Sequence, residues 1–69
     1  MFVTDLFGIM EHDLLQKGQS RMDVSSEKMP QEDIEEVEKK LLNEGYQVRV
    51  TFVEDGYILQ AWSNDVKWH

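Results

Sequence analysis

Cysteine is absent from this chain of 69 residues, and basic residues are scarce: seven lysines and arginines stand against fourteen aspartates and glutamates. Without cysteine, neither a disulfide nor a cysteine-based zinc site can stabilise so small a domain. A single core of this size buries about 60% of the surface of the unfolded chain, which makes it marginally stable. Association with a second copy is the remaining way to bury more surface, so we expect a homodimer.

Long apolar runs and a basic N-terminal region are also missing. The first fifteen residues contain acids at Asp5, Glu11 and Asp13, which is not the pattern of a signal peptide or of a membrane-spanning helix. Hydrophobic residues make up 41% of the chain and charged residues 30%, which is typical of a folded protein. We therefore expect a single domain over residues 1–69, located in the cytoplasm.

The sequence contains no recognisable catalytic constellation. A cysteine nucleophile is excluded, and no serine lies in a sharp turn flanked by glycines. Glu11, His12 and Asp13 are metal-ligand types in a row, but consecutive helical residues point about 100° apart and cannot all bind one ion. We therefore predict a protein that is not an enzyme and that holds no metal or cofactor. Acid–base chemistry by paired carboxylates is the remaining enzymatic alternative.

Two segments have the apolar spacing of helices, residues 4–17 and residues 30–44. Their inward positions are Val3, Phe7, Met10 and Leu14 in the first and Ile34, Val37 and Leu41 in the second. Gly18 and Gly45 suit the left-handed conformation that ends a helix. Residues 18–29 between the two segments are polar and lack a period, so we expect a loop there.

Residues 46–53 alternate between apolar and polar side chains, and Asp55-Gly56 is a strong hairpin signal. We expect a hairpin in which Val53 pairs with Ile58 and Val50 pairs with Ala61. One face then holds Phe52, Val50, Leu59 and Ala61. The other face keeps three apolar residues that a solvent-exposed face does not require, and these are candidates for a dimer interface: Val53, Ile58 and Trp62.

The expected order of elements is therefore helix, helix, strand, strand, which is an α+β fold of the α-α-β-β type. A single hairpin makes a poor sheet. We expect two chains to dimerise through the sheet, either by joining hairpins into one four-stranded sheet or by packing one sheet on another.

Carboxylates concentrate in and around the second predicted helix. The candidate acidic residues are Glu32, Asp33, Glu35, Glu36, Glu38, Glu44, Glu54 and Asp55. Glu35 and Glu36 each precede a lysine by four residues, so a solvated, ion-paired helix face explains part of the run. The remaining acids have no such partner, and acids one helical turn apart lie about 5–6 Å from each other. This spacing is of the same order as that of the charges on a duplex strand. We infer a mimic of DNA that occupies the basic cleft of a DNA-binding protein.

The segment EDIEEVEKKLLNEG followed by YQVRVTFVEDGYILQAW, in a small acidic chain without cysteine, resembles the acidic host-takeover proteins of lytic Bacillus phages. It is similar in particular to those that mimic DNA and inhibit the histone-like nucleoid protein HU. The resemblance implies a homodimer that binds the basic DNA-contact surface of HU in the host cytoplasm and displaces DNA. The carboxylates named above would make the contacts, and the protein itself would not bind nucleic acid, because its net charge is −7.

A second interpretation assigns binding to the apolar sheet face of Val53, Ile58 and Trp62. The protein would then be an inhibitor or adaptor that acts on host RNA polymerase or on another host protein, and the acids would keep it soluble. The two interpretations differ in the salt dependence that they predict, because salt screens charge contacts and not apolar ones.

Overall fold

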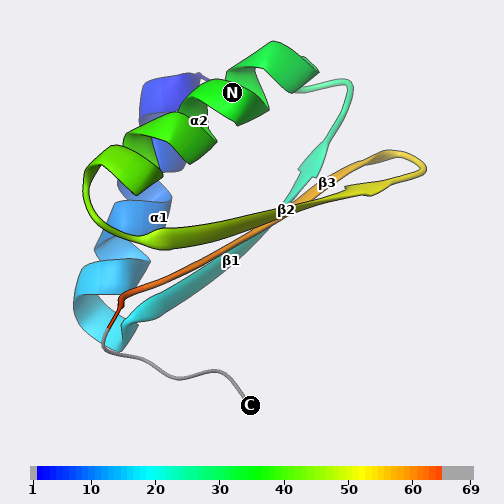
Figure 1. Cartoon of the computed structure of the whole chain (residues 1–69). Coiled ribbons are helices and arrows are strands. Elements are labelled where there is room, and N and C mark those ends of the chain that lie inside the picture. Colours follow the sequence, from blue (N-terminus) through cyan, green and yellow to red (C-terminus); the bar gives the residue numbers. More distant parts are fainter. Residues whose placement is uncertain (1, 65–69) are drawn as a thin grey trace.

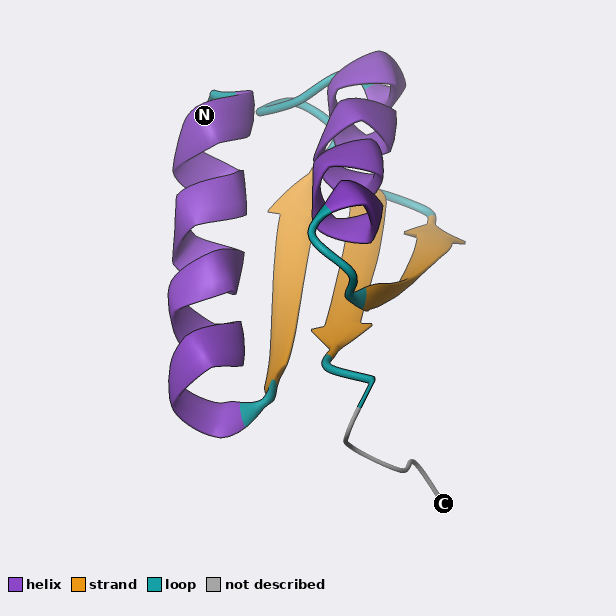
Figure 2. Cartoon of the chain, turned by 60° about the vertical axis from the view of Figure 1, so that its left-hand side comes forward, coloured by secondary structure: helices purple, strands orange, loops and turns teal. Residues whose placement is uncertain are grey.

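The computed structural model describes residues 2–64, which form two helices and three strands (Figure 1). The elements are α1 (Val3–Lys17), β1 (Gln19–Ser25), α2 (Gln31–Asn43), β2 (Gln47–Val53) and β3 (Gly56–Trp62). The strands make one antiparallel sheet in the order β1-β3-β2. Both helices cover the same face of this sheet, and the other face is left open (Figure 2). The predicted α+β class is confirmed.

The segment expected to be a loop, residues 18–29, contains strand β1, so the predicted α-α-β-β order is wrong. Ser20, Met22 and Val24 point toward the helices, and Ser20 and Val24 are buried. The pattern is weak because Ser20 is polar and because serine and aspartate have low strand propensity. Pairing with β3 along all seven residues stabilises the strand, and this long-range contact is not visible in the local sequence.

Glycine ends both helices, as predicted. Gly18 has a φ of 79°, and its N–H donates to the carbonyl of Leu14 at 2.8 Å. Gly45 follows α2 with a φ of 92°. Both angles lie in the left-handed region, which glycine adopts without a steric penalty. The short turns after these glycines return the chain to the sheet.

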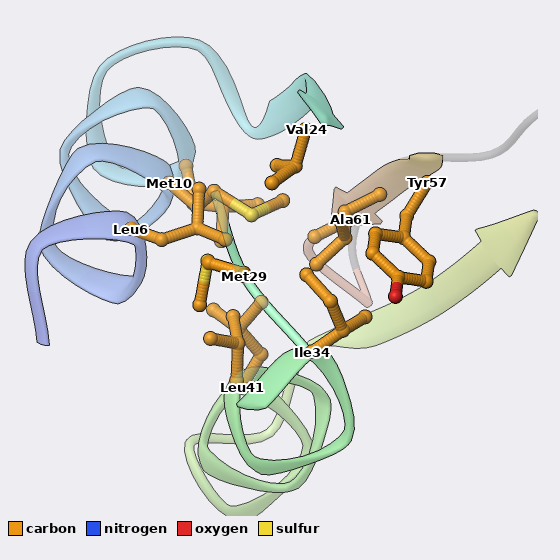
Figure 3. Close-up of a cluster of buried hydrophobic side chains, with 11 residues drawn as sticks. Leu6, Met10, Val24, Met29, Ile34, Leu41, Tyr57 and Ala61 are labelled. Carbon is orange, nitrogen blue, oxygen red and sulfur yellow. The ribbon is translucent and has the colours of Figure 1, made fainter. Parts of the chain in front are cut away.

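The core lies between the helices and the sheet (Figure 3). Its buried side chains are Leu6, Met10 and Leu14 of α1, Ile34, Val37 and Leu41 of α2, Val24, Tyr57, Leu59 and Ala61 of the sheet, and Met29 before α2. The predicted helical stripes are largely confirmed, although Leu6 is fully buried and Phe7 lies at the margin. Each fully buried aliphatic side chain contributes about 1.5–3 kcal/mol to stability.

Strands β2 and β3 pair with Val53 opposite Gly56 and Val50 opposite Leu59. The register differs by two residues from the predicted one, because the turn consists of Glu54 and Asp55 and Gly56 belongs to β3. A shift of two residues leaves every side chain on its face. The predicted division of the hairpin into two faces is therefore confirmed.

At Gly56 the backbone of β1 leaves no room for a side chain on β3. A Cβ atom there would overlap the backbone carbonyl of Val24, whereas a Cβ atom on Gly8 of α1 would meet nothing within 4 Å. We predict that Gly56→Ala lowers the free energy of unfolding by about 1–3 kcal/mol. The control, Gly8→Ala, should raise it by about 1 kcal/mol, because alanine favours helix. Urea unfolding at fixed protein concentration measures both, and a fully stable Gly56→Ala variant would contradict the close approach.

Candidate functional site: an acidic surface

The candidate carboxylates lie along the outer side of α2 and at the turn between β2 and β3. Ile34, Val37 and Leu41 of α2 face the core, so the intervening residues are turned toward solvent. Exposure is high at Glu32, Glu35, Glu36, Glu44, Glu54 and Asp55, and intermediate at Asp33 and Glu38. We call this set of eight residues the acidic surface. The structure brings all of them to the outside of the molecule.

Two hydrogen bonds hold the hairpin turn against the end of β1, in the segment that leads into α2. The N–H and the hydroxyl of Ser26 donate to the carbonyl of Asp55 at 2.9 and 3.1 Å. The turn and the start of α2 consequently lie at the same end of the molecule, and α2 runs from there toward the opposite end (Figure 1). A helix of thirteen residues is about 20 Å long. The acidic surface thus extends over a length comparable to about six phosphates of one DNA strand.

The ion pairs predicted within α2 do not form. The side chains of Glu35 and Lys39 are not within ion-pair distance, and the same holds for Glu36 and Lys40. Within residues 2–64 the ion pair that forms is Arg21–Asp23, at 3.5 Å. Lys40 instead places its Nζ atom 6.0 Å from the centre of the Phe7 ring. The acidic run is therefore a solvated helix face, as expected, and its carboxylates are turned toward solvent without a described ion pair.

Arginine is concentrated on the open face of the sheet. Arg21 of β1 and Arg49 of β2 both lie opposite Gln60 of β3, which places the three side chains in one row across the sheet. The chain's charge is consequently uneven, because the acidic surface lies on the helical side and on the hairpin turn. Attraction to a positively charged partner is therefore strongest on the helical side.

The apolar candidates Val53, Ile58 and Trp62 share the open face, as predicted. Val53 is 46% exposed, and the other two are half-buried. Gln60 separates Ile58 from Trp62 along β3, and the register pairs Trp62 with Gln47 and Gln19, not with Arg49. The three residues are therefore brought to one face but do not form an unbroken apolar patch.

Several large apolar side chains are exposed. Phe52 was expected on the core face, yet it is 59% exposed and touches Tyr57 edge-to-face with a centroid distance of 5.8 Å. Ile9 and Leu15, which lie off the predicted apolar stripe of α1, are also exposed. The position of Phe52 next to the hairpin turn is the one sequence signal that could have indicated exposure, because strand ends often extend beyond the helix that covers them.

The hollows of the surface are shallow. One, of about 410 Å³, is lined by residues of α1, β1 and β3, including Asp13, Ser20 and Arg21. Its buried hydroxyl, that of Ser20, donates to Asp13 at 3.1 Å. Among residues 2–64 no three acidic or histidine side chains are close enough together to hold a metal ion. Trp68 and His69 lie outside the described residues.

No protein-family model matches this sequence, and the chain has no significant match among curated proteins or among solved structures. In the described part of the chain, no helix is long and apolar enough to cross a membrane. Its function must therefore be inferred from its own surface.

Carboxylates that serve a partner and not the fold can be replaced with little effect on stability. We predict that changing Glu35 and Glu36 together to Gln alters the free energy of unfolding by at most about 0.5 kcal/mol. Ser20→Ala, which removes the buried hydroxyl that donates to Asp13, should cost about 1 kcal/mol. Urea unfolding compares the two variants, and a larger loss in the glutamine variant would assign those acids a structural role.

Proposed function

We propose that the protein is a DNA mimic that binds the basic DNA-binding surface of a nucleoid protein such as HU and blocks its binding to DNA. It would act as a homodimer in the cytoplasm of the host cell. One observation carries the proposal: carboxylates lie at the hairpin turn, along the first two turns of α2 from Glu32 to Glu38 and again at Glu44, without ion pairs in the described structure. Folding does not require such a row, because acids that face solvent contribute little to stability.

The physical basis of the proposal is competition for the same cations. A DNA-binding protein neutralises phosphates with lysine and arginine side chains. Carboxylates held on a helix offer these side chains alternative partners for charge-assisted hydrogen bonds. Because the helix is already folded, little conformational entropy is lost on binding. The net charge of −7 also speeds the encounter with a basic protein.

The decisive experiment is displacement of labelled duplex DNA from purified HU by the protein. We predict that changing Glu32 and Glu35 and Glu36 to Gln weakens displacement by about tenfold, since three exposed contacts of about 0.5 kcal/mol each are lost. A matched control removes three acids elsewhere: Asp5→Asn and Glu11→Gln on α1, and Asp23→Asn on the open face. The control should displace DNA nearly as well as the wild type. Equal loss in both variants would show that net charge acts without a defined site, and no displacement by the wild type would refute the proposal.

Salt provides an independent measurement. Direct binding of the protein to HU in the absence of DNA should weaken steeply as salt rises from about 0.1 M to about 1 M, because the Debye length falls from about 10 Å to about 3 Å. Isothermal titration calorimetry at several salt concentrations measures this. An affinity that stays constant would mean that apolar contacts hold the partner.

The open face of the sheet supports a second candidate function, that of an inhibitor or adaptor acting on RNA polymerase or another host protein. The observation in its favour is that helices leave this face uncovered while Val53, Ile58 and Trp62 lie on it. Here Trp62→Ala should abolish binding to the partner, and the affinity should not depend on salt. Retention of partner binding by Trp62→Ala in a pull-down from host lysate would exclude this candidate.

A further inference from the structure

The sheet has two free edges, because β3 lies in the middle and both β1 and β2 pair with it alone. The backbone N–H and C=O groups along a free edge are a template for pairing with another strand. Which residues present these groups depends on the hydrogen-bond pattern of the antiparallel ladder, in which successive residues point alternately toward and away from the neighbouring strand.

The hydrogen bonds at both ends of the β1–β3 ladder determine this pattern. Ser26 donates its N–H to the carbonyl of Asp55, and Ser63 donates its N–H to the carbonyl of Gly18, each in line with the register of the two strands. The odd-numbered residues of β3 therefore bond to β1 and the even-numbered ones bond to β2. In β2 the partners of those even-numbered residues are odd-numbered. The odd-numbered residues of β2 therefore direct their backbone groups toward β3, and the even-numbered ones direct theirs toward the free edge. These are Val48, Val50 and Phe52.

The two edges differ in their side chains. By the same alternation, Arg21 and Asp23 are among the residues that present backbone groups on the free edge of β1, and their side chains form an exposed ion pair. Charged side chains protect an edge against pairing. The residues on the free edge of β2 are all apolar, and Phe52 is 59% exposed. Strand β2 also contains no proline, and its one charged residue, Arg49, is not among those that present backbone groups on the free edge, so its edge is the less protected one.

We propose that two copies of this protein pair through their β2 edges, antiparallel and about a two-fold axis at Val50. Val48 then lies opposite the partner's Phe52, Val50 lies opposite the partner's Val50, and Arg49 lies opposite the partner's Thr51. Every outward backbone group of β2 finds a partner in this register. The result is one six-stranded sheet with the order β1-β3-β2-β2-β3-β1.

The two neighbouring registers, with the two-fold axis at Arg49 or at Thr51, are less favourable. An axis at Arg49 would place two arginines directly opposite each other, which destabilises a strand pair. An axis at Thr51 would place Val48 opposite the partner's Glu54, so that an acid of the turn enters the sheet. The axis at Val50 instead joins the apolar side chains of the two strands into one row on the helical face.

The dimer would also shape the acidic surface. A two-fold axis perpendicular to a continuous sheet keeps all four helices on one face. Because α2 lies over β2, the two acidic surfaces would lie next to each other across the joined edge. The dimer itself does not depend on the DNA-mimic proposal, because it follows from the edge of β2 and is tested without a partner protein.

Two substitutions of Thr51, one to a positively charged and one to a negatively charged residue, test the register of the dimer. In the dimer Thr51 faces the partner's Arg49 twice by symmetry, whereas in the monomer it is exposed on the open face. Sedimentation velocity over a dilution series should show that Thr51→Arg raises the dimer dissociation constant by about tenfold, whereas Thr51→Glu lowers it severalfold. Repulsion between net charges predicts the reverse order, because Thr51→Glu makes each chain more negative. Shifts in that reverse order, or in one common direction, would overturn the proposal.

A proline at the edge supplies the second test. Val50→Pro removes an outward N–H that the monomer does not use and should abolish the dimer, whereas Asp23→Pro makes the same change on the edge of β1 and should leave it intact. Circular dichroism checks that both variants are folded. A wild type that is monomeric at every concentration, a dimer lost through Asp23→Pro, or a dimer lost through Trp62→Ala on the open face would each refute pairing through β2.

Discussion

The pairing of β3 with both of its neighbours is the constraint on which the rest of this structure depends. The strand β3 lies between β1 and β2; its pairing with β2 is a local hairpin, but the sheet is complete only when β1, which lies on the far side of α2 in sequence, has paired with β3. Its inward side chains Tyr57, Leu59 and Ala61 then form the floor on which both helices pack. The cost of this arrangement is visible at Gly56, where the backbone of β1 comes so close that a side chain has no room.

Placing both helices on one face of the sheet separates the charges of the molecule. The acids of α2 must face solvent because Ile34, Val37 and Leu41 occupy the buried side of the helix. Both arginines, Arg21 and Arg49, lie on the opposite face of the sheet from the acids of α2. A dimer joined at β2 would enlarge the acidic side without covering it. The fold and the proposed mimicry of DNA are thus linked through the one-sided sheet.

Much of the fold was predictable because its signals are local. Helical spacing identified α1 and α2, glycines marked their ends, and alternation assigned the two faces of the β2–β3 hairpin. Strand β1 was missed because the inward residue Ser20 is polar and because serine and aspartate have low strand propensity, and its stability comes from pairing with β3. The Glu36–Lys40 ion pair expected from four-residue spacing does not form, and Lys40 instead lies near Phe7 on the neighbouring helix. Spacing predicts which side chains are neighbours, whereas packing decides which of them touch.

The sequence by itself determined the composition of the surface: an excess of seven negative charges, a run of acids on one amphipathic helix, and no residues for a disulfide. These features depend on residue type and on helical period, which are local properties. The tertiary structure alone decided where β1 pairs, which edges remain free, and that Phe52 and the backbone of β2 face solvent. Edges and exposure depend on the order of strands in the sheet, and that order is set by contacts between distant parts of the chain.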